Sequence, residues 1–398
     1  MKLPGAPWRT RSGMPRLLRA LGADKGETRF VGGCVRDTLL GIEVSDVDLA
    51  TRLTPDSVLA RLDRAKIKAV PTGIAHGTVT AVTGGAPVEV TTLRRDVATD
   101  GRRATIAFTD DWREDAARRD FTINALSADP GSGEIFDYFD GLADLDTRTV
   151  RFIGEPLQRI AEDHLRILRF FRFHARFGQG EPDGAGLAAC AARANDLMAL
   201  SRERIADELL KLLALPDPAP TVTLMVERRI FRPVLPEIES AARLTALVEA
   251  ERRGGIAPEA VRRLAALLPP DAEIAASVAA RLRLSKRLAK RLASAAQTAL
   301  DAPEVLAYRI GAAEAVDRFL LHADPPPPDL AALSQWKRPR LPVGGGDLVA
   351  MGLEAGPVVA ATLRAIERDW AAGGFSADAG AVRAMARRHV DQALRASQ

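Results

Sequence analysis

The pattern of apolar and polar residues along the chain changes character near residue 155. Before that point, strand-like alternation is mixed with helical spacing. The segment TRFVGGCVRD (28–37) predicts a strand, a glycine turn and a helix, and VSDVDLAT (44–51) predicts a short strand. Two β-branched runs in TVTAVTGGAPVEVTTLR (78–94) predict a hairpin that turns at 84–87. The first part of the chain is therefore predicted to be an α/β domain.

After residue 155 the chain is rich in Ala, Leu and Arg at helical spacing, and strand signals vanish. This change predicts an all-helical arm. The segment 157–178 predicts one amphipathic helix. A glycine-rich loop at 178–186 and a proline-rich connector at 322–329 interrupt the arm. The stretch 281–291 carries six basic residues and no acid, which fits a solvated helix face and an RNA-facing strip equally well.

Composition narrows the class of protein only slightly. The 398 residues are enough for two or more domains. Lys and Arg total 56 against 52 Asp and Glu, and this small excess of +4 fits a nucleic-acid partner without identifying one. Cys34 and Cys190 have neither metal-type nor disulfide spacing, which predicts a cytoplasmic protein. No apolar run reaches about 18 residues, so no membrane span is expected.

Asp46 and Asp48 are the first candidates for chemistry. On a strand their i, i+2 spacing places both side chains on one face. Two neighbouring carboxylates repel each other and favour a bound divalent cation, for which Mg²⁺ is the oxygen-preferring choice. Such carboxylates serve metal-assisted phosphoryl transfer. Glu89 alternates with Val88 and Val90 and is a candidate third ligand, although an exposed strand glutamate explains it equally well.

A glycine pair lies upstream of these carboxylates. Gly32 and Gly33 stand between the predicted strand and helix, where backbone N–H groups can approach a phosphate. Arg36 is placed to add a charge-assisted contact to the same group. The alternative is a turn that only packs the helix against the strand. A glycine pair followed by two carboxylates is what a nucleoside triphosphate and its metal ions require together, so we predict a triphosphate site.

Five segments in this order resemble the motifs of one enzyme family. They are GGCVRD with DVDLAT, RRDFTINA (118–125), DYFDGLADL (137–145), EDHLR (162–166) and SRERIADELL (201–210). This series resembles the class II tRNA nucleotidyltransferase family, which contains CCA-adding enzymes and bacterial poly(A) polymerases. The resemblance extends over about residues 28–212. Near the C-terminus, the residues from Gly344 to Trp370 also look like the tail of bacterial CCA-adding enzymes.

The resemblance implies an architecture and further site residues. It implies a nucleotidyltransferase head with a small mixed sheet, at residues 1–140, and three all-helical parts. These are a neck at 141–215, a body at 216–324 and a tRNA-binding tail at 325–398. Asp120 and Asn124 would lie near the nucleotide ribose. We expect Arg119 and Arg169 to make further nucleotide contacts.

The fourth motif has a chemical interpretation of its own. Cytosine and adenine each present an exocyclic amine beside a ring-nitrogen acceptor. A carboxylate accepts from that amine and a guanidinium donates to the ring nitrogen, so Asp163 and Arg166 are predicted to select C and A. Uracil and guanine carry the inverse pattern and would leave buried polar groups unpaired. Glu162 is predicted to orient Arg166. An ordinary surface ion pair is the alternative.

The predicted activity is addition of C, C and A to the tRNA 3′ end from CTP and ATP, with Mg²⁺ as cofactor. Three alternatives stay open: a poly(A) polymerase, an enzyme that adds only C or only A, and a non-catalytic tRNA-binding protein. The charged stretch 91–103 is predicted to be a solvated loop. The resemblance implies that this loop assists the switch from C to A, with Arg94, Arg95 and Asp96 taking part, which argues against a C-only enzyme.

Overall fold

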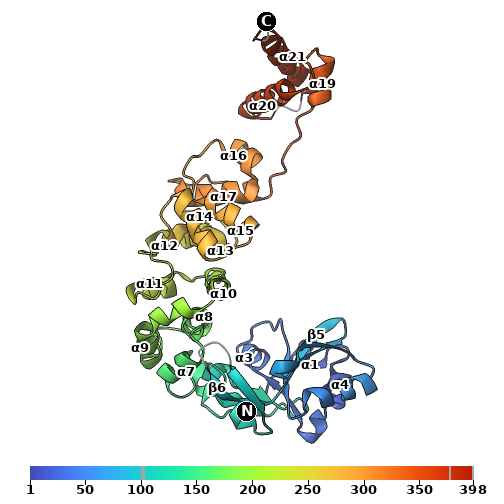
Figure 1. The fold of residues 1–398 in the computed structure, drawn as a ribbon, viewed down its shortest axis with the longest axis vertical. Coiled ribbons are helices and arrows are strands. Elements are labelled where there is room, and N and C mark those ends of the chain that lie inside the picture. The colour runs from blue at the N-terminus through green and yellow to red at the C-terminus, as the bar shows by residue number, and fades with distance from the viewer. Residues whose placement is uncertain (100–103, 376–377, 397–398) are drawn as a thin grey trace. The chain divides into compact units, whose positions relative to one another are not determined.

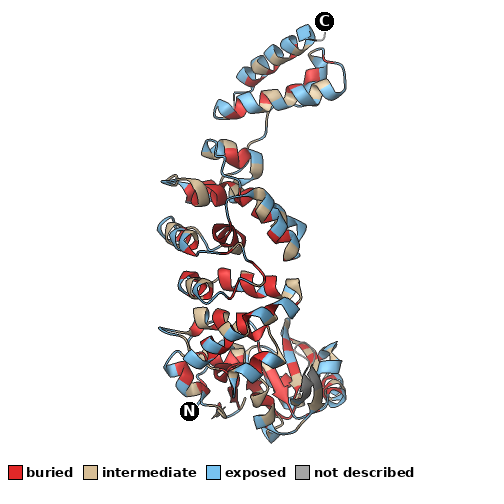
Figure 2. Cartoon of the chain, turned by 60° about the vertical axis from the view of Figure 1, so that its left-hand side comes forward, coloured by how far each residue is buried: buried red, intermediate tan, exposed pale blue. Residues whose placement is uncertain are grey.

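A computed structural model describes residues 1–99, 104–375 and 378–396. The chain divides into two compact units, Met1–Pro236 and Glu237–Gln398. Figure 1 shows that strands occur in the first unit and that the second is built from helices. Buried residues line the inner sides of the elements within each unit (Figure 2). The expected α/β head followed by an all-helical arm is confirmed.

The first unit contains a seven-stranded mixed sheet in the order β3-β4-β5-β2-β1-β8-β9. The strands are β1 (Thr28–Val31), β2 (Asp48–Thr51), β3 (Lys68–Gly73), β4 (Thr78–Thr83), β5 (Ala86–Thr92), β8 (Ser127–Ala128) and β9 (Ile135–Phe136). Only β2 and β5 pair in parallel; the other neighbours are antiparallel. Burial along β4 alternates residue by residue, as expected of a strand with one face in the core. The predicted hairpin of β4 and β5 is confirmed.

Helices cover the sheet and continue from it. Those of the first unit are α1 (Pro7–Thr10), α2 (Met14–Ala20), α3 (Gly33–Leu39), α4 (Pro55–Arg64), α5 (Trp112–Ala117), α6 (Gly141–Asp146), α7 (Pro156–Glu162), α8 (Arg166–Phe177), α9 (Gly184–Ala192), α10 (Arg202–Leu213) and α11 (Ala219–Glu227). Helix α4 packs against β3 and β4. Helix α8, which begins at Arg166, the last residue of the fourth motif, packs against α10 and α11.

Two sequence-based predictions in this unit are wrong. The stretch 91–103, predicted to be a solvated loop, contains strand β6 (Arg94–Thr99), which pairs with β7 (Ala104–Phe108) in a separate hairpin; residues 100–103 lie outside the described residues. Its β-branched residues have strand propensity that the neighbouring charges obscured. The segment 157–178 forms two helices, α7 and α8, because the backbone is extended at Asp163 (φ −151°, ψ 106°).

The second unit consists of α12 (Ala242–Arg253), α13 (Ala260–Leu267), α14 (Ala272–Arg281), α15 (Lys286–Ala295), α16 (Pro303–Ile310), α17 (Ala312–His322), α18 (Leu330–Ser334), α19 (Gly345–Ala350), α20 (Pro357–Ala372) and α21 (Ala379–Ala396). One apolar cluster includes Tyr308, Leu348, Ile366, Trp370 and Val390 and joins α16 to α19, α20 and α21. No helix in the described part of the chain is long and apolar enough to cross a membrane.

The basic stretch 281–291 is not one helix, because α14 ends at Arg281 and α15 begins at Lys286. Two of its six basic side chains form ion pairs with acidic residues of the same unit. Arg281 pairs with Glu237 at 2.5 Å, and Arg291 pairs with Asp317 at 2.7 Å. Lys286, Arg287 and Lys290 are exposed on α15. The stretch is therefore partly structural, which its sequence alone does not reveal.

Candidate active site

A pocket of about 720 Å³ in the first unit contains nearly every predicted site residue. Its walls come from the β1–α3 turn, β2, β5, the segment after α5, and α8. Among the residues predicted from the sequence, it is lined by Gly32, Gly33, Arg36, Asp46, Asp48, Glu89, Arg119, Asp120, Asn124, Asp163, Arg166 and Arg169. Glu162 is not part of the lining, whereas Arg94, which the resemblance connects with the switch from C to A, is. Residues as far apart in the sequence as Gly32 and Arg169 thus face one cavity.

The carboxylates lie where two parallel strands run side by side. Asp48 opens β2 and is in register with Glu89 of β5, so both side chains project from the same face of the sheet. Asp46 precedes the strand instead of belonging to it; it is exposed and accepts a hydrogen bond from the Ser45 hydroxyl at 2.8 Å. The strand predicted at 44–51 therefore begins only at Asp48, four residues later than predicted.

The electrostatic state of Asp48 shows how crowded these carboxylates are. Burial raises its pKa to about 6, and the negative charges of Glu89 and Asp46 act in the same direction, while Arg119 opposes them. Excess negative charge of this kind is relieved by a divalent cation with oxygen ligands. Among the described residues, no three acidic, histidine or cysteine side chains converge on one point. The donor chemistry fits a divalent metal, and the nucleotide phosphates would have to complete its ligand shell.

The glycine turn adopts the conformation that its sequence predicts. Gly32 has φ +68°, which L-residues other than glycine rarely adopt, and a side chain there would meet the Arg119 guanidinium at 2.9 Å. The strand, turn and helix prediction for 28–37 is confirmed. Arg36 is buried in α3, where its Nε donates to Asp37 at 2.7 Å and its Nη1 donates to the Asn124 side chain. Arg36 thus ties the turn to Asn124.

Both carboxylate oxygens of Asp120 accept two hydrogen bonds each from neighbouring residues. Its Oδ1 accepts from the Phe121 N–H and from Asn124 Nδ2, each at 2.9 Å. Its Oδ2 accepts from Arg169 Nε at 2.8 Å and Nη2 at 2.5 Å. Burial by itself would raise the pKa of Asp120, but Arg169 and these hydrogen bonds lower it overall. Asp120 is therefore an ionised anchor for Arg169 and Asn124, both of which line the pocket.

Glu162, Asp163 and Arg166, the candidate base-selecting residues of the fourth motif, lie where α7 ends and α8 begins. The Arg166 guanidinium donates to Glu162 at 2.7 Å and to the backbone carbonyls of Arg159 and Arg118 at 2.8 and 3.0 Å. Glu162 therefore holds Arg166 from outside the pocket, in the geometry expected of an orienting residue. Asp163 does not pair with Arg166. Its two oxygens instead accept from Arg204 Nη2 at 3.1 and 3.0 Å.

Sequence reasoning did not assign two residues that support this arrangement. Arg204 lies on α10, within the motif SRERIADELL (201–210), and it fixes the carboxylate of Asp163. Arg118 supplies a backbone carbonyl to Arg166 and pairs with Asp115 at 2.8 Å. Arg118 stood inside a recognised motif, which was a usable signal. Nothing in the sequence linked Arg204 to Asp163, 41 positions away.

Crowded acidic side chains beside a glycine turn, on a mixed sheet followed by helices, define a nucleotidyltransferase. Comparison with known proteins narrows this class. Residues 28–151 match the family described as the poly A polymerase head domain, and residues 184–242 match the probable RNA and SrmB-binding site of polymerase A. The mitochondrial CCA tRNA nucleotidyltransferase 1 of Mus musculus is 34% identical over 91% of this chain and 87% of its own. The chain therefore belongs to the class II CCA-adding tRNA nucleotidyltransferase family.

Other relatives are consistent with this membership. The CCA-adding enzyme of Levilactobacillus brevis is 44% identical over 189 residues, which span 47% of this chain and 46% of its own. The crystal structure of the Bacillus stearothermophilus CCA-adding enzyme in complex with CTP has a TM-score of 0.71 at 27% identity and covers 90% of this chain and 93% of that one. A Thermotoga maritima CCA-adding enzyme complexed with tRNA, at 21% identity and a TM-score of 0.67, shares the fold.

Proposed function

We propose that this chain adds C, C and A to the 3′ end of tRNA from CTP and ATP, with release of pyrophosphate. One observation carries the proposal: carboxylates suited to a metal line the same pocket as a carboxylate and a guanidinium, those of Asp163 and Arg166, that are suited to cytosine and adenine. The relatives are named for this activity. We also propose the cytoplasm as its compartment, in keeping with two free cysteines, and the division into head, neck, body and tail given above.

Asp46 and Asp48, with Glu89 as third candidate, would hold Mg²⁺, which supplies activation of the RNA 3′ hydroxyl and neutralises charge on the triphosphate. The hydroxyl oxygen forms a bond to the α-phosphorus as the bond to the pyrophosphate oxygen breaks. Gly32 and Gly33 let the backbone approach the phosphates, and Arg36 adds positive charge at the same turn. The hydroxyl proton passes to water.

The nucleotide base and ribose are assigned to the other side of the pocket. Asp163 accepts from the exocyclic amine of cytosine or adenine while Arg166 donates to the ring nitrogen. Asp120 and Asn124 receive the ribose; because four internal hydrogen bonds already occupy the Asp120 carboxylate, a ribose hydroxyl would have to replace one of them. Arg119 and Arg169 add contacts to the nucleotide.

The test uses purified protein, tRNA lacking its terminal nucleotides, Mg²⁺, and each NTP alone or all four together, followed by sequencing of the product ends. The proposal expects CC with CTP alone and CCA with all four NTPs together. Runs of A on any RNA would identify a poly(A) polymerase, and partial ends would identify a C-only or A-only enzyme. Absence of any extension would leave a tRNA-binding protein.

Replacing both Asp163 and Arg166 with alanine should flatten the preference for CTP and ATP over UTP and GTP. Each hydrogen bond to a charged partner contributes roughly 1.5–3 kcal/mol, so the discrimination ratio should fall by at least about tenfold. Kinetics with each NTP on the same tRNA measure the ratio. Asp207→Ala/Lys211→Ala is the matched control, because this exposed pair lies on α10 away from the pocket. An unchanged ratio in the double variant would rule out the base-reading role.

The rate of transfer should fall as the pH drops through about 6, because protonation of Asp48 removes a ligand for the cation. Asp48 faces Glu89 on β5, Asp46 in its own segment and Arg119 after α5. A cation favours the ionised carboxylate, so raising Mg²⁺ should move the midpoint of the pH–rate profile to lower pH. The profile is measured at two Mg²⁺ concentrations. The same midpoint pH at both Mg²⁺ concentrations would contradict the assignment of Asp48 as a metal ligand.

A further inference from the structure

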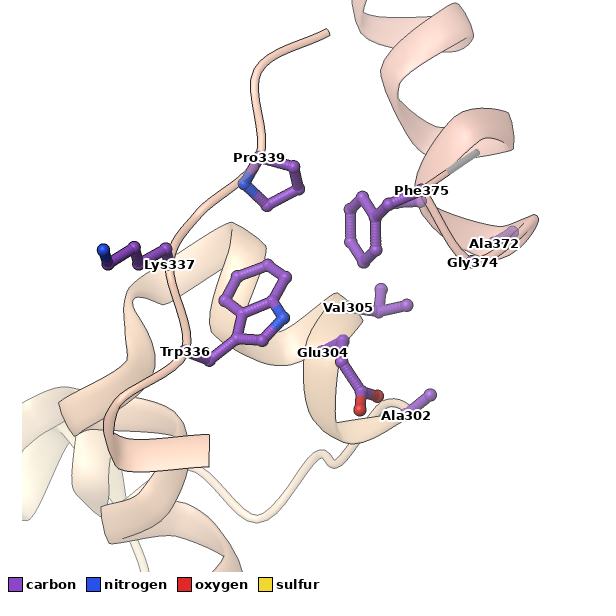
Figure 3. A pocket seen from close by; sticks show the side chains of 10 residues that line it. Ala302, Glu304, Val305, Trp336, Lys337, Pro339, Ala372, Gly374 and Phe375 are labelled. Atoms are coloured by element: carbon purple, nitrogen blue, oxygen red, sulfur yellow. The ribbon is translucent and has the colours of Figure 1, made fainter. Parts of the chain in front are cut away.

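The second unit has an aromatic hollow that none of the recognised motifs includes. It encloses about 420 Å³ and is lined by Trp336, Pro339 and Phe375 together with residues at the start of α16 and the end of α20. Figure 3 shows the rings of Trp336, Pro339 and Phe375 around the open space, while Lys337 extends away from Phe375. A second hollow of about 410 Å³ shares Trp336 and Glu304 with the first and continues toward Pro327.

Trp336 packs against the apolar cluster of the second unit but is only partly buried there. Its ring centroid lies 5.5 Å from that of Phe375, which in turn contacts Tyr308 and Trp370 at 5.1 and 5.2 Å. Trp336 itself is only half-buried, and both hollows border its side chain. The fold therefore presents a large aromatic side chain, held in place from behind, at an open cavity.

Positive charge accompanies this aromatic surface. Lys337, Arg338 and Arg340 follow Trp336 directly and are exposed. The Arg338 guanidinium lies 4.3 Å from the Tyr308 ring centroid, which keeps it close to the cluster. The carboxylates at the two hollows are Glu304 and Asp329. Aromatic faces bordered by cations are the combination that binds unpaired nucleobases together with their phosphates.

We propose that Trp336 stacks against an unpaired base of the RNA substrate, with Lys337, Arg338 and Arg340 contacting the adjoining phosphates. This inference rests on the proposed function, because that function supplies the RNA. The site is separate from the nucleotide pocket, which lies in the other unit. Substitutions at Trp336 should therefore change the affinity for the RNA and leave selection of the incoming nucleotide unchanged.

The first test compares Trp336→Ala with Trp336→Phe, using tRNA that lacks its terminal nucleotides. Loss of one stacked base corresponds to roughly a five- to hundredfold weaker Kd, so the alanine variant should bind the tRNA within that range. The phenylalanine variant keeps an aromatic face and should stay within about threefold of the wild type. The KM for CTP should stay unchanged in both. A wild-type Kd in the alanine variant overturns the proposal.

A second measurement does not depend on how well the alanine variant folds. Stacking against a base quenches tryptophan fluorescence, so tRNA should quench the wild type and quench Trp336→Phe much less. Trp8→Phe is the control, since Trp8 is also half-buried but packs on Phe30 in the first unit, and it should keep the quenching. Equal quenching in Trp336→Phe and the wild type overturns the proposal.

Two other outcomes separate this inference from its alternatives. If light scattering shows a wild-type dimer that Trp336→Ala converts to a monomer, the hollow holds a second copy of the chain and the RNA assignment is wrong. If the wild type binds tRNA but extends no end, the proposed function fails while the stacking site is judged by the quenching alone.

Discussion

Replacing Asp48 with asparagine should reduce nucleotide transfer by about a thousandfold, and Asp46→Asn should have a similar effect. Asparagine preserves the size of the side chain but removes the charge that a divalent cation requires. The effect should fall on kcat, because the phosphates contact other residues of the pocket. Single-turnover extension of tRNA with CTP, at saturating Mg²⁺, measures it.

The fold should survive this change. Burial and the charges of Glu89 and Asp46 disfavour the ionised form of Asp48, so a neutral side chain relieves repulsion in the absence of metal. We therefore expect Asp48→Asn to unfold at the same or a higher denaturant concentration than the wild type. Asp56→Asn is a suitable control, because Asp56 is exposed on α4 outside the pocket. Extension at the wild-type rate by a folded Asp48→Asn variant would refute the catalytic assignment.

Asp317→Ala should lower the free energy of unfolding by about 3–5 kcal/mol, the usual result when one partner of a buried ion pair is removed. Asp317 is fully buried and accepts from Arg262 of α13 and Arg291 of α15. Glu251 of α12, equally hidden, pairs with Arg262 and Arg263. The cluster joins four helices. Alanine at 317 would leave the buried Arg262 with Glu251 as its only remaining carboxylate partner in the cluster, and Arg291 with Glu259 at 3.4 Å.

Urea unfolding followed by the helical circular-dichroism signal measures this loss. Asp301→Ala is the matched control, since Asp301 pairs with Arg309 on the surface, where such pairs contribute only about 0–1 kcal/mol. The nucleotide pocket lies in the other unit, so the KM for CTP should be unchanged in samples that remain folded. A loss no larger than that of Asp301→Ala would mean that water or other groups replace the missing carboxylate.

The sequence predicted the elements that local chemistry determines. Gly32 is required where the chain turns with positive φ, and the alternation around Glu89 placed that side chain on the polar face of its strand. The series of motifs also predicted that residues distant in the sequence, such as Asp48 and Arg166, belong to one site, and the two residues line the same pocket. These inferences depend on near neighbours in the chain or on a series of motifs that is improbable by chance.

Other features depend on partners that are distant in sequence. The helix break at Asp163 was missed because Glu162, Asp163 and His164 are each compatible with a helix interior; the Asp163 side chain accepts the Leu165 N–H and the bonds of Arg204, which favours the extended backbone. The β6–β7 hairpin was missed because its charged residues resemble those of a loop. Arg291 was interpreted as surface charge although it completes a buried cluster.

The acceptors of Arg166 include two main-chain carbonyl oxygens, those of Arg118 and Arg159. No substitution removes a main-chain oxygen, so amino-acid changes at positions 118 and 159 leave these two acceptors in place. Altering position 166 itself would remove the Arg166 donor from both oxygens, while the Glu162 carboxylate would keep its ion pair with Arg159. If Arg166 selects the base as proposed, engineering this protein to accept uracil or guanine would require moving the main chain at positions 118 and 159 as well as exchanging the side chains of Asp163 and Arg166.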